Sequence, residues 1–316
     1  MAPDKPAEYP IRALMDSSGI PWRLPRSELA TRYGVRPHPA YGWDVIEIET
    51  PHSFFPNLLW PLSVQAFPNF STRMPATEFS SHIYVDADAR TNLSVAEKRL
   101  TDLLGQGNSH NSSSNTLVRY WKFGAAKAEL MVWPPDLQQW PMTNPAHERE
   151  PRLKTACHLA INSGYRIPCS AHELAMLQTF ELISAIGVKE STRSHVRDSP
   201  AHQSELEFVR EPHSEAMNLF GLLGRSADDA TLIFFNSQLY LVPMTDVIGF
   251  RVARVRPAKG PGGSHLHVEC RTSCEAATKS LLITSADGVE DLKRVAAKVS
   301  GATGRPFKLD DYQDDS

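Results

Sequence analysis

The sequence predicts an α+β protein of two domains, each an antiparallel sheet packed with one or a few helices. The chain has 316 residues, a length that suggests about two domains. Its hydrophobic content of 41% and charged content of 22% are ordinary for a chain that buries a core. Short apolar runs typical of strands recur in both halves of the chain, beside a few helical segments with capping residues.

Apolar runs predict the strands. In the N-terminal half they are WDVIEIE (43–49), SSHIYVDA (80–87), the two arms of a hairpin in NTLVRYWKFGAAKAELMVWPP (115–135) and TACHLAI (155–161). In the C-terminal part they are TLIFF (231–235), QLYLV (238–242), VIGFRVARV (247–255), HLHVECR (265–271) and KSLLIT (279–284).

Helical periodicity and capping residues predict the helices. They are Glu28–Tyr33 after a Ser27 cap, 91–107 with a Ser94/Glu97 capping box and a stop at Gly105, 170–187 with a Ser170/Glu173 capping box, a short helix around 215–224, and 288–301 with a stop at Gly301. Residues 1–20 are expected to form a loose arm. The acidic tail 310–316 is expected to be frayed.

The polar segment VKESTRSHVRDSPAHQSE is the best linker candidate, because it is charged and has no apolar periodicity. We therefore predict an N-terminal α+β domain over residues 1–187, a linker over 188–205 and a strand-rich C-terminal domain over 206–316.

Charge and hydropathy limit the class of protein. The net charge of -3 argues against a broad nucleic-acid-binding surface, which would show a basic face. The start of the chain lacks a signal-peptide pattern, and no stretch approaches the ~18 apolar residues of a membrane span. Four cysteines are too few for a disulfide framework. We expect a cytoplasmic protein without a membrane span.

The segment CHLAINSGYRIPCSAHE (157–173) is the strongest lead to chemistry. It holds two cysteines and two histidines, Cys157, His158, Cys169 and His172, followed by Glu173. Zinc takes thiolate and imidazole ligands. The part PCSAHE resembles the PCxxC half of the zinc deaminases. That resemblance implies an enzyme in which Cys157, Cys169 and His172 bind zinc and Glu173 acts as acid and base.

Strand geometry favours a structural interpretation of the same segment. Adjacent strand residues point to opposite faces, so Cys157 and His158 cannot easily reach one metal ion. The H-x-E motif that deaminases also need occurs only downstream, at 213–215. We predict a strand–turn–helix joint with no metal ion, cofactor or catalytic residue. A zinc-dependent hydrolase or deaminase is the alternative.

Candidate partner-binding residues are aromatic or acidic. They are Phe54, Phe55 and Trp60 in a Pro-rich segment, Trp133 and Trp140 around WPPDLQQW, and the pair Asp228 and Asp229. Aromatic residues dominate binding hot spots, and acidic groups steer association with a basic partner. Core packing of the aromatic side chains and a solvated acidic loop are the other interpretations.

Two resemblances suggest a binding role. The element order over 228–309 is similar to a pleckstrin-homology-like module, in which a curved antiparallel sheet lies under one C-terminal helix. Its first hairpin, FFNSQLYL, lacks the basic residues of the lipid-binding members. Residues 20–140, with PRSELATRYGV, EKRLTDLLGQG and RYWKFGAAKAELMVWPP, resemble bacterial immunity proteins that bind and block secreted antibacterial toxins.

The resulting hypothesis is a non-enzymatic cytoplasmic binding protein, specifically an immunity protein whose partner is a cognate toxin. The alternatives are the zinc-dependent enzyme and an adaptor or scaffold protein.

Overall fold

The structure is a computed structural model with the α+β fold that the sequence predicts. It describes residues 7–37, 44–48, 62–65, 71–86, 90–111, 117–133, 154–188, 195–196, 207–256, 262–272 and 278–314. Contacts divide the chain into two compact units. The first unit is Met1–Ala66 with Met74–Tyr165, and the second is Phe67–Arg73 with Arg166–Ser316.

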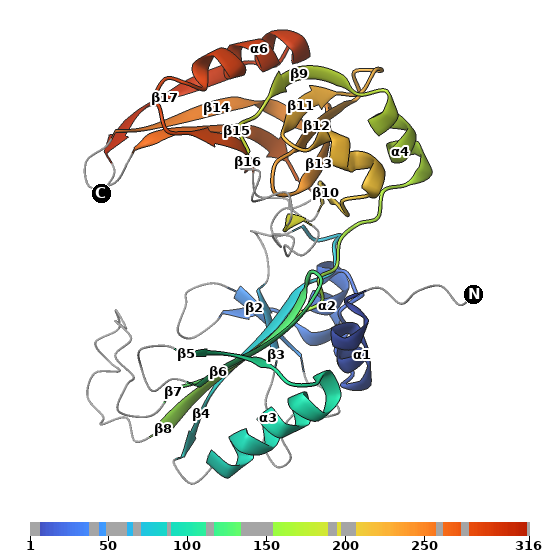
Figure 1. Ribbon diagram of the computed structural model, residues 1–316, viewed down its shortest axis with the longest axis vertical. Coiled ribbons are helices and arrows are strands. Elements are labelled where there is room, and N and C mark those ends of the chain that lie inside the picture. The colour runs from blue at the N-terminus through green and yellow to red at the C-terminus, as the bar shows by residue number, and fades with distance from the viewer. Residues whose placement is uncertain are drawn as a thin grey trace. The chain divides into compact units, whose positions relative to one another are not determined.

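An antiparallel eight-stranded sheet forms the centre of the first unit (Figure 1). Its strands are β1 (Arg36–Pro37), β2 (Asp44–Ile48), β3 (Leu62–Gln65), β4 (Glu78–Asp86), β5 (Asn108–Asn111), β6 (Leu117–Phe123), β7 (Ala126–Trp133) and β8 (Lys154–Asn162). Their order is β1-β2-β3-β4-β8-β7-β6-β5. The predicted hairpin is confirmed as β6 and β7, paired from Leu117↔Val132 to Phe123↔Ala126.

Three helices share a hydrophobic core with this sheet. They are α1 (Tyr9–Ser17), α2 (Arg26–Tyr33) and α3 (Arg90–Leu104). The core includes Ile11 and Met15 of α1, Leu29 of α2, Leu100 of α3 and Trp121 of β6. The expectation of a loose arm over residues 1–20 is therefore wrong for α1, whose apolar stripe is buried.

The other two helices begin earlier than predicted. Helix α2 starts at Arg26, one residue before its expected cap Ser27. Helix α3 starts at Arg90, so Ser94 lies within it rather than before it. Its stop is confirmed, since Gly105 follows the last helical residue with a φ of 82°.

The second unit contains a five-stranded antiparallel sheet in the order β10-β13-β12-β11-β9. Its strands are β9 (Glu181–Ala185), β10 (Val209–Arg210), β11 (Leu222–Arg225), β12 (Thr231–Phe235) and β13 (Leu239–Pro243). Helix α4 (Ala171–Gln178) and the 3₁₀ helix η6 (Ser214–Leu219) pack against it. The shared core includes Leu177, Leu219, Ile233, Phe235 and Leu241.

The prediction of one helix over 170–187 is wrong in its second half. Helix α4 ends at Gln178, and the following residues form β9, which pairs with β11. The short helix expected around 215–224 likewise stops at Leu219, after which β11 begins.

The division between the units differs from the predicted domain boundary at residue 187. It falls after Tyr165, because α4 and β9 belong to the second unit. Val196, inside the expected linker 188–205, is fully buried in the core with α4 and η6. Its carbonyl accepts a hydrogen bond from Arg166.

A four-stranded sheet and helix α6 complete the second unit (Figure 1). The strands are β14 (Val247–Arg256), β15 (Gly263–Arg271), β16 (Thr278–Ala286) and β17 (Phe307–Asp314), and the helix is α6 (Lys293–Thr303). The order is β16-β15-β14-β17, with β17 parallel to β14. The five C-terminal strands predicted from sequence are confirmed, and they divide between the two sheets.

The C-terminal end departs from two expectations. Gly301 lies inside α6, and the left-handed residue after the helix is Gly304, with a φ of 65°. The tail that was expected to fray from residue 310 forms most of β17. A strand therefore follows α6. Among the described residues, no helix is both long and apolar enough to cross a membrane.

Candidate functional site

Cys157 and His158 lie on opposite faces of β8, as strand alternation predicts. Cys157 is fully buried in the core of the first unit, whereas His158 is partly exposed. Burial raises the pKa of the Cys157 thiol to about 12. This thiol is therefore protonated at neutral pH and packs as a small apolar side chain.

Cys169 and His172 lie in the second unit, at the start of α4. The predicted capping box is confirmed: the Ser170 hydroxyl accepts from the Glu173 amide, and the Glu173 carboxylate accepts from the Ser170 amide. Burial, with a contribution from the charge of Glu173, raises the pKa of Cys169 to about 11. A protonated thiol is a poor nucleophile.

Cys157 belongs to the first unit, whereas Cys169 and His172 belong to the second. In the parts of the chain that the structure describes, no group of three or more His, Cys, Asp or Glu side chains could hold a metal ion. The downstream H-x-E motif has a capping role, because Nδ1 of His213 accepts a hydrogen bond from the Glu215 amide at the start of η6.

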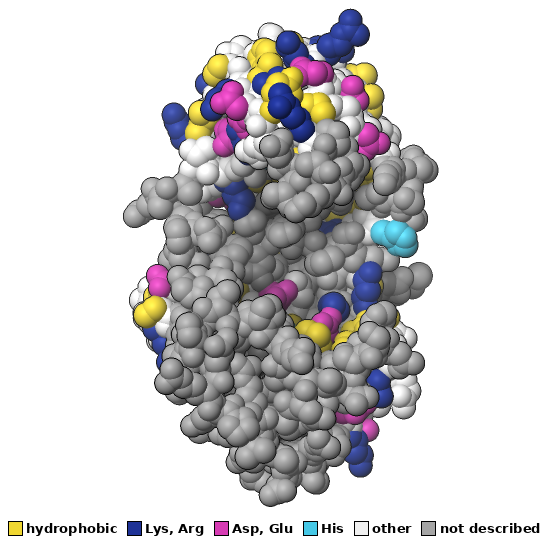
Figure 2. Space-filling model, turned by 90° about the vertical axis from the view of Figure 1, so that its left-hand side faces the viewer, with side chains coloured by type: hydrophobic (Ala, Val, Ile, Leu, Met, Phe, Trp, Pro, Cys, Tyr) yellow, Lys and Arg dark blue, Asp and Glu magenta, His cyan; other side chains and the backbone are white. Residues whose placement is uncertain are grey.

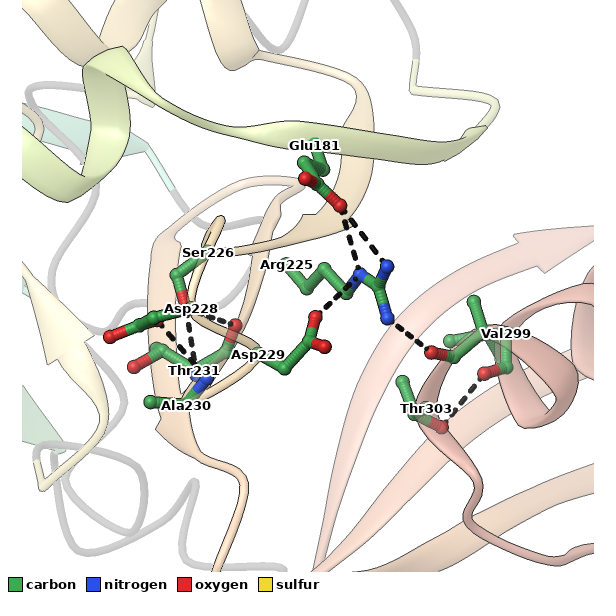
Figure 3. A network of polar contacts seen from close by, with 10 residues as sticks. Glu181, Arg225, Ser226, Asp228, Asp229, Ala230, Thr231, Val299 and Thr303 are labelled. Atoms are coloured by element: carbon green, nitrogen blue, oxygen red, sulfur yellow. Dashed lines mark hydrogen bonds and ion pairs between the residues drawn. The ribbon is translucent and has the colours of Figure 1, made fainter.

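The acidic pair Asp228 and Asp229 shapes the turn between β11 and β12 (Figure 3). The Asp228 carboxylate accepts hydrogen bonds from the Ser226 hydroxyl at 2.5 Å and the Ala230 amide at 3.1 Å. These bonds lower the pKa of Asp228. Asp229 adopts a positive φ of 60° and pairs with Arg225 at 2.9 Å. Both acids stay exposed at a turn whose conformation their own contacts hold.

Arg225 extends this network to a second strand and to a helix. Its guanidinium also binds the Glu181 carboxylate of β9 at 3.1 Å and donates to the Ala302 carbonyl of α6 at 2.7 Å (Figure 3). Arg225 of β11 therefore connects β9 and α6, and these contacts stabilise the fold of the second unit.

The predicted aromatic site can be placed only in part. Phe54, Phe55, Trp60 and Trp140 lie outside the described residues. Trp133 is the last residue of β7, where it pairs with Ala156 of β8, and its side chain lies outside the described part.

One face of the four-stranded sheet is polar and accessible. Along β15, Ser264, Leu266, Val268 and Cys270 are buried, while His265, His267 and Glu269 are partly exposed. Helix α6 packs on β14 and β17, and its buried residues Ala296 and Val299 are apolar. We use the name "open face" for Arg251, His265, His267, Glu269, Ser280, Leu282, Ser285 and Asp310, the accessible side chains that register and hydrogen bonds place together.

Arg251 organises the open face. Its guanidinium binds Glu269 at 3.0 Å and Asp310 at 2.7 Å, and it donates to the Ser280 hydroxyl at 3.2 Å. The three charged side chains are 32%, 23% and 12% exposed, in the order Arg251, Glu269, Asp310. Such partly buried, mutually bound charges hold fixed positions before any partner arrives.

His267 lies directly across from Arg251 in the sheet. Burial first, and then the charge of Arg251, lower the pKa of His267 to about 4. Its imidazole is therefore neutral at physiological pH. Nδ1 of His265 lies 2.8 Å from the Ser285 hydroxyl.

The open face was not predicted from the sequence, although the pattern of one of its strands indicates part of it. The alternation in HLHVECR places His265, His267 and Glu269 on one side of a strand. The contribution of Asp310 has no local signal, because it depends on the parallel pairing of β17 with β14.

Comparison with known proteins finds no match. No model of a known protein family matches the chain, and no curated protein matches it significantly. On the side of the molecule shown in Figure 2, basic and acidic side chains are interspersed over the described surface of the second unit. The open face likewise carries both signs, in Arg251, Glu269 and Asp310. Recognition there would therefore depend on where each charge lies rather than on an excess of one sign.

Proposed function

We propose that this chain is a non-enzymatic binding protein, specifically an immunity protein that neutralises a secreted antibacterial toxin by direct contact in the cytoplasm. The observation that supports this proposal best is the open face, where Arg251, Glu269 and Asp310 hold one another in place. The resemblance of residues 20–140 to immunity proteins supplies the kind of partner.

The open face has the properties of a preorganised contact surface. Arginine is one of the residues that dominate binding hot spots. Arg251 is already ordered by two carboxylates, so it would lose little further side-chain entropy on contact with a partner. Leu282, which is 38% exposed and pairs with His267, adds apolar area beside the charges.

The lipid-binding form of the adaptor hypothesis has less support. The hairpin between β12 and β13 carries no basic residue, and its Asn236 side chain donates to the Leu282 and Ile283 carbonyls of β16. The tip of this hairpin therefore serves packing within the unit.

Co-purification tests the proposal. The chain would be expressed with the product of any adjacent gene that encodes a secreted toxin, and the affinity of the complex would be measured by calorimetry. We expect a complex tighter than micromolar and loss of toxin activity on binding. Absence of any complex at micromolar concentration would reject the immunity role.

A matched pair of variants tests whether the open face makes the contact. Arg251→Gln removes the central charge and should weaken the complex by about 30-fold, a typical hot-spot effect of ~2 kcal/mol. Arg294→Gln removes an exposed arginine of α6 and should leave affinity unchanged. Equal affinities of the two variants would place the contact elsewhere.

A further inference from the structure

The open face carries a second arrangement, distinct from the Arg251 ion pairs. His265 and His267 are separated by one residue of β15, and both are partly exposed. Because side chains alternate along a strand, the two imidazoles project from the same face at neighbouring positions. Imidazole nitrogens are the preferred ligands of Zn²⁺, Cu²⁺ and Ni²⁺.

Ser285 orients one of the two rings. Its hydroxyl lies 2.8 Å from Nδ1 of His265. When Nδ1–H donates to this hydroxyl, the lone pair of Nε2 is left for a ligand. Metal-binding histidines usually donate their other ring nitrogen to such a neighbour, which fixes the tautomer and the ring orientation.

His267 would bind a metal ion through one nitrogen of its ring. Its Nδ1 atom is buried, so an ion on the accessible face cannot reach that nitrogen. An ion held by both histidines would therefore bind Nε2 of His267, as it would bind Nε2 of His265.

The charges around the pair do not prevent a cation from binding. The nearest cation is Arg251, opposite His267. Glu269 and Asp310 both bind its guanidinium, so the charge of Arg251 is compensated locally. Lys308 is a second cation near this face, since it pairs with Arg251 across β14 and β17 and lies 4.0 Å from Asp310. The remaining open-face neighbours, Ser280, Leu282 and Ser285, are uncharged.

We propose that His265 and His267 form a binding site for a divalent transition-metal ion, with water completing the coordination shell. The site has two protein ligands, one imidazole nitrogen from each histidine. Its affinity should follow the order of imidazole complexes, with Cu²⁺ above Ni²⁺ and Zn²⁺. The hard ions Mg²⁺ and Ca²⁺ should not bind, because they prefer oxygen ligands. The site does not depend on the proposed toxin-binding role.

Calorimetric titration of the untagged full-length chain with Cu²⁺ and Zn²⁺ tests this proposal. His265→Asn and His267→Asn should each weaken one binding event by about 100-fold, because the second imidazole binds at the effective concentration that the first one sets. Ser285→Ala removes only the orienting hydroxyl from an exposed position and should weaken the same event by about tenfold.

Controls separate this site from the other histidines of the chain. His172→Asn changes an exposed histidine of α4 in the same unit and should leave the binding event intact. Circular dichroism confirms that each variant is folded. For Cu²⁺, the paramagnetic resonance spectrum should show two equatorial nitrogens in the wild type and one in either open-face histidine variant. The proposal would be overturned if the binding event survives in both His265→Asn and His267→Asn, or if it is lost in His172→Asn.

Discussion

Glu173 holds two parts of the second unit together through one carboxylate. It caps α4 through the Ser170 amide and pairs with Arg210 of β10 at 2.8 Å, with the two side chains 18% and 15% exposed. Burial alone would raise the pKa of Glu173, but hydrogen bonds from Ser170 and Arg210 outweigh burial, and the pKa is lowered below 4.5.

A lowered carboxylate pKa makes stability depend on pH in a defined direction. The unfolded chain takes up the Glu173 proton near pH 4.5, before the folded protein does. The stabilisation is therefore fully present above that pH and is lost as the pH falls through the lower folded value. We expect Glu173→Gln to cost about 1 kcal/mol at pH 7, since solvent screens part of the attraction, and to cost nothing in strong acid.

Urea unfolding of wild type and Glu173→Gln between pH 7 and pH 3 measures this difference. Glu211→Gln, at an exposed position on the adjoining segment, is the control and should run parallel to the wild type. A constant gap between wild type and Glu173→Gln over the whole range would contradict the assignment.

Residues with local partners were the ones that sequence could predict. The Ser170/Glu173 capping box is visible because its partners are three positions apart. The same reasoning correctly separated Cys157 from His158. The pairing of Arg251 with Asp310 joins residues 59 positions apart and follows only from the sheet topology, so the candidate site could not be assembled from sequence alone.

At the scale of elements, the clearest failure was the segment after α4. Leu182, Ile183 and Ile186 fit a helical pattern, yet β9 forms there because pairing with β11 overrides local preference. Because Gly224 has no side chain, β11 can lie close to β9 at this position. A Cβ at this position would lie 2.2 Å from the Glu181 carbonyl oxygen and 2.4 Å from the Phe180 ring.

Two glycine-to-alanine variants should therefore act in opposite directions. Gly224→Ala forces β9 and the Phe180 ring away from β11, and we expect destabilisation of about 1–3 kcal/mol. Gly301→Ala adds a methyl group inside α6 where no atom lies within 4 Å, and we expect stabilisation of about 0.5–1 kcal/mol from helix propensity. Thermal unfolding of both variants measures the effects. Equal shifts of the two melting temperatures would show that β9 does not approach β11 this closely.

At the scale of the whole molecule, the polar segment 188–205 does not coincide with the boundary between the two units. The run 188–205 has no apolar periodicity, but Val196 within it is buried and the carbonyl of Val196 binds Arg166. A domain boundary is a place in the chain that few tertiary contacts cross. Tertiary contacts join residues far apart in the sequence, so the composition of one segment does not show where such a boundary lies. The contacts place Arg166–Ser316, together with Phe67–Arg73, in the second unit.

Two fragments distinguish these boundaries. A fragment of residues 166–316 keeps every strand of both sheets of the second unit, whereas 188–316 lacks α4 and β9. Without β9 the edge of β11 loses its partner, and without α4 the core loses Leu177. We expect 166–316 to unfold cooperatively in urea and to show dispersed amide resonances, and 188–316 to do neither. If 188–316 folds as well as the longer fragment, residues 166–187 are not part of the second unit, and the boundary predicted at residue 187 is the correct one.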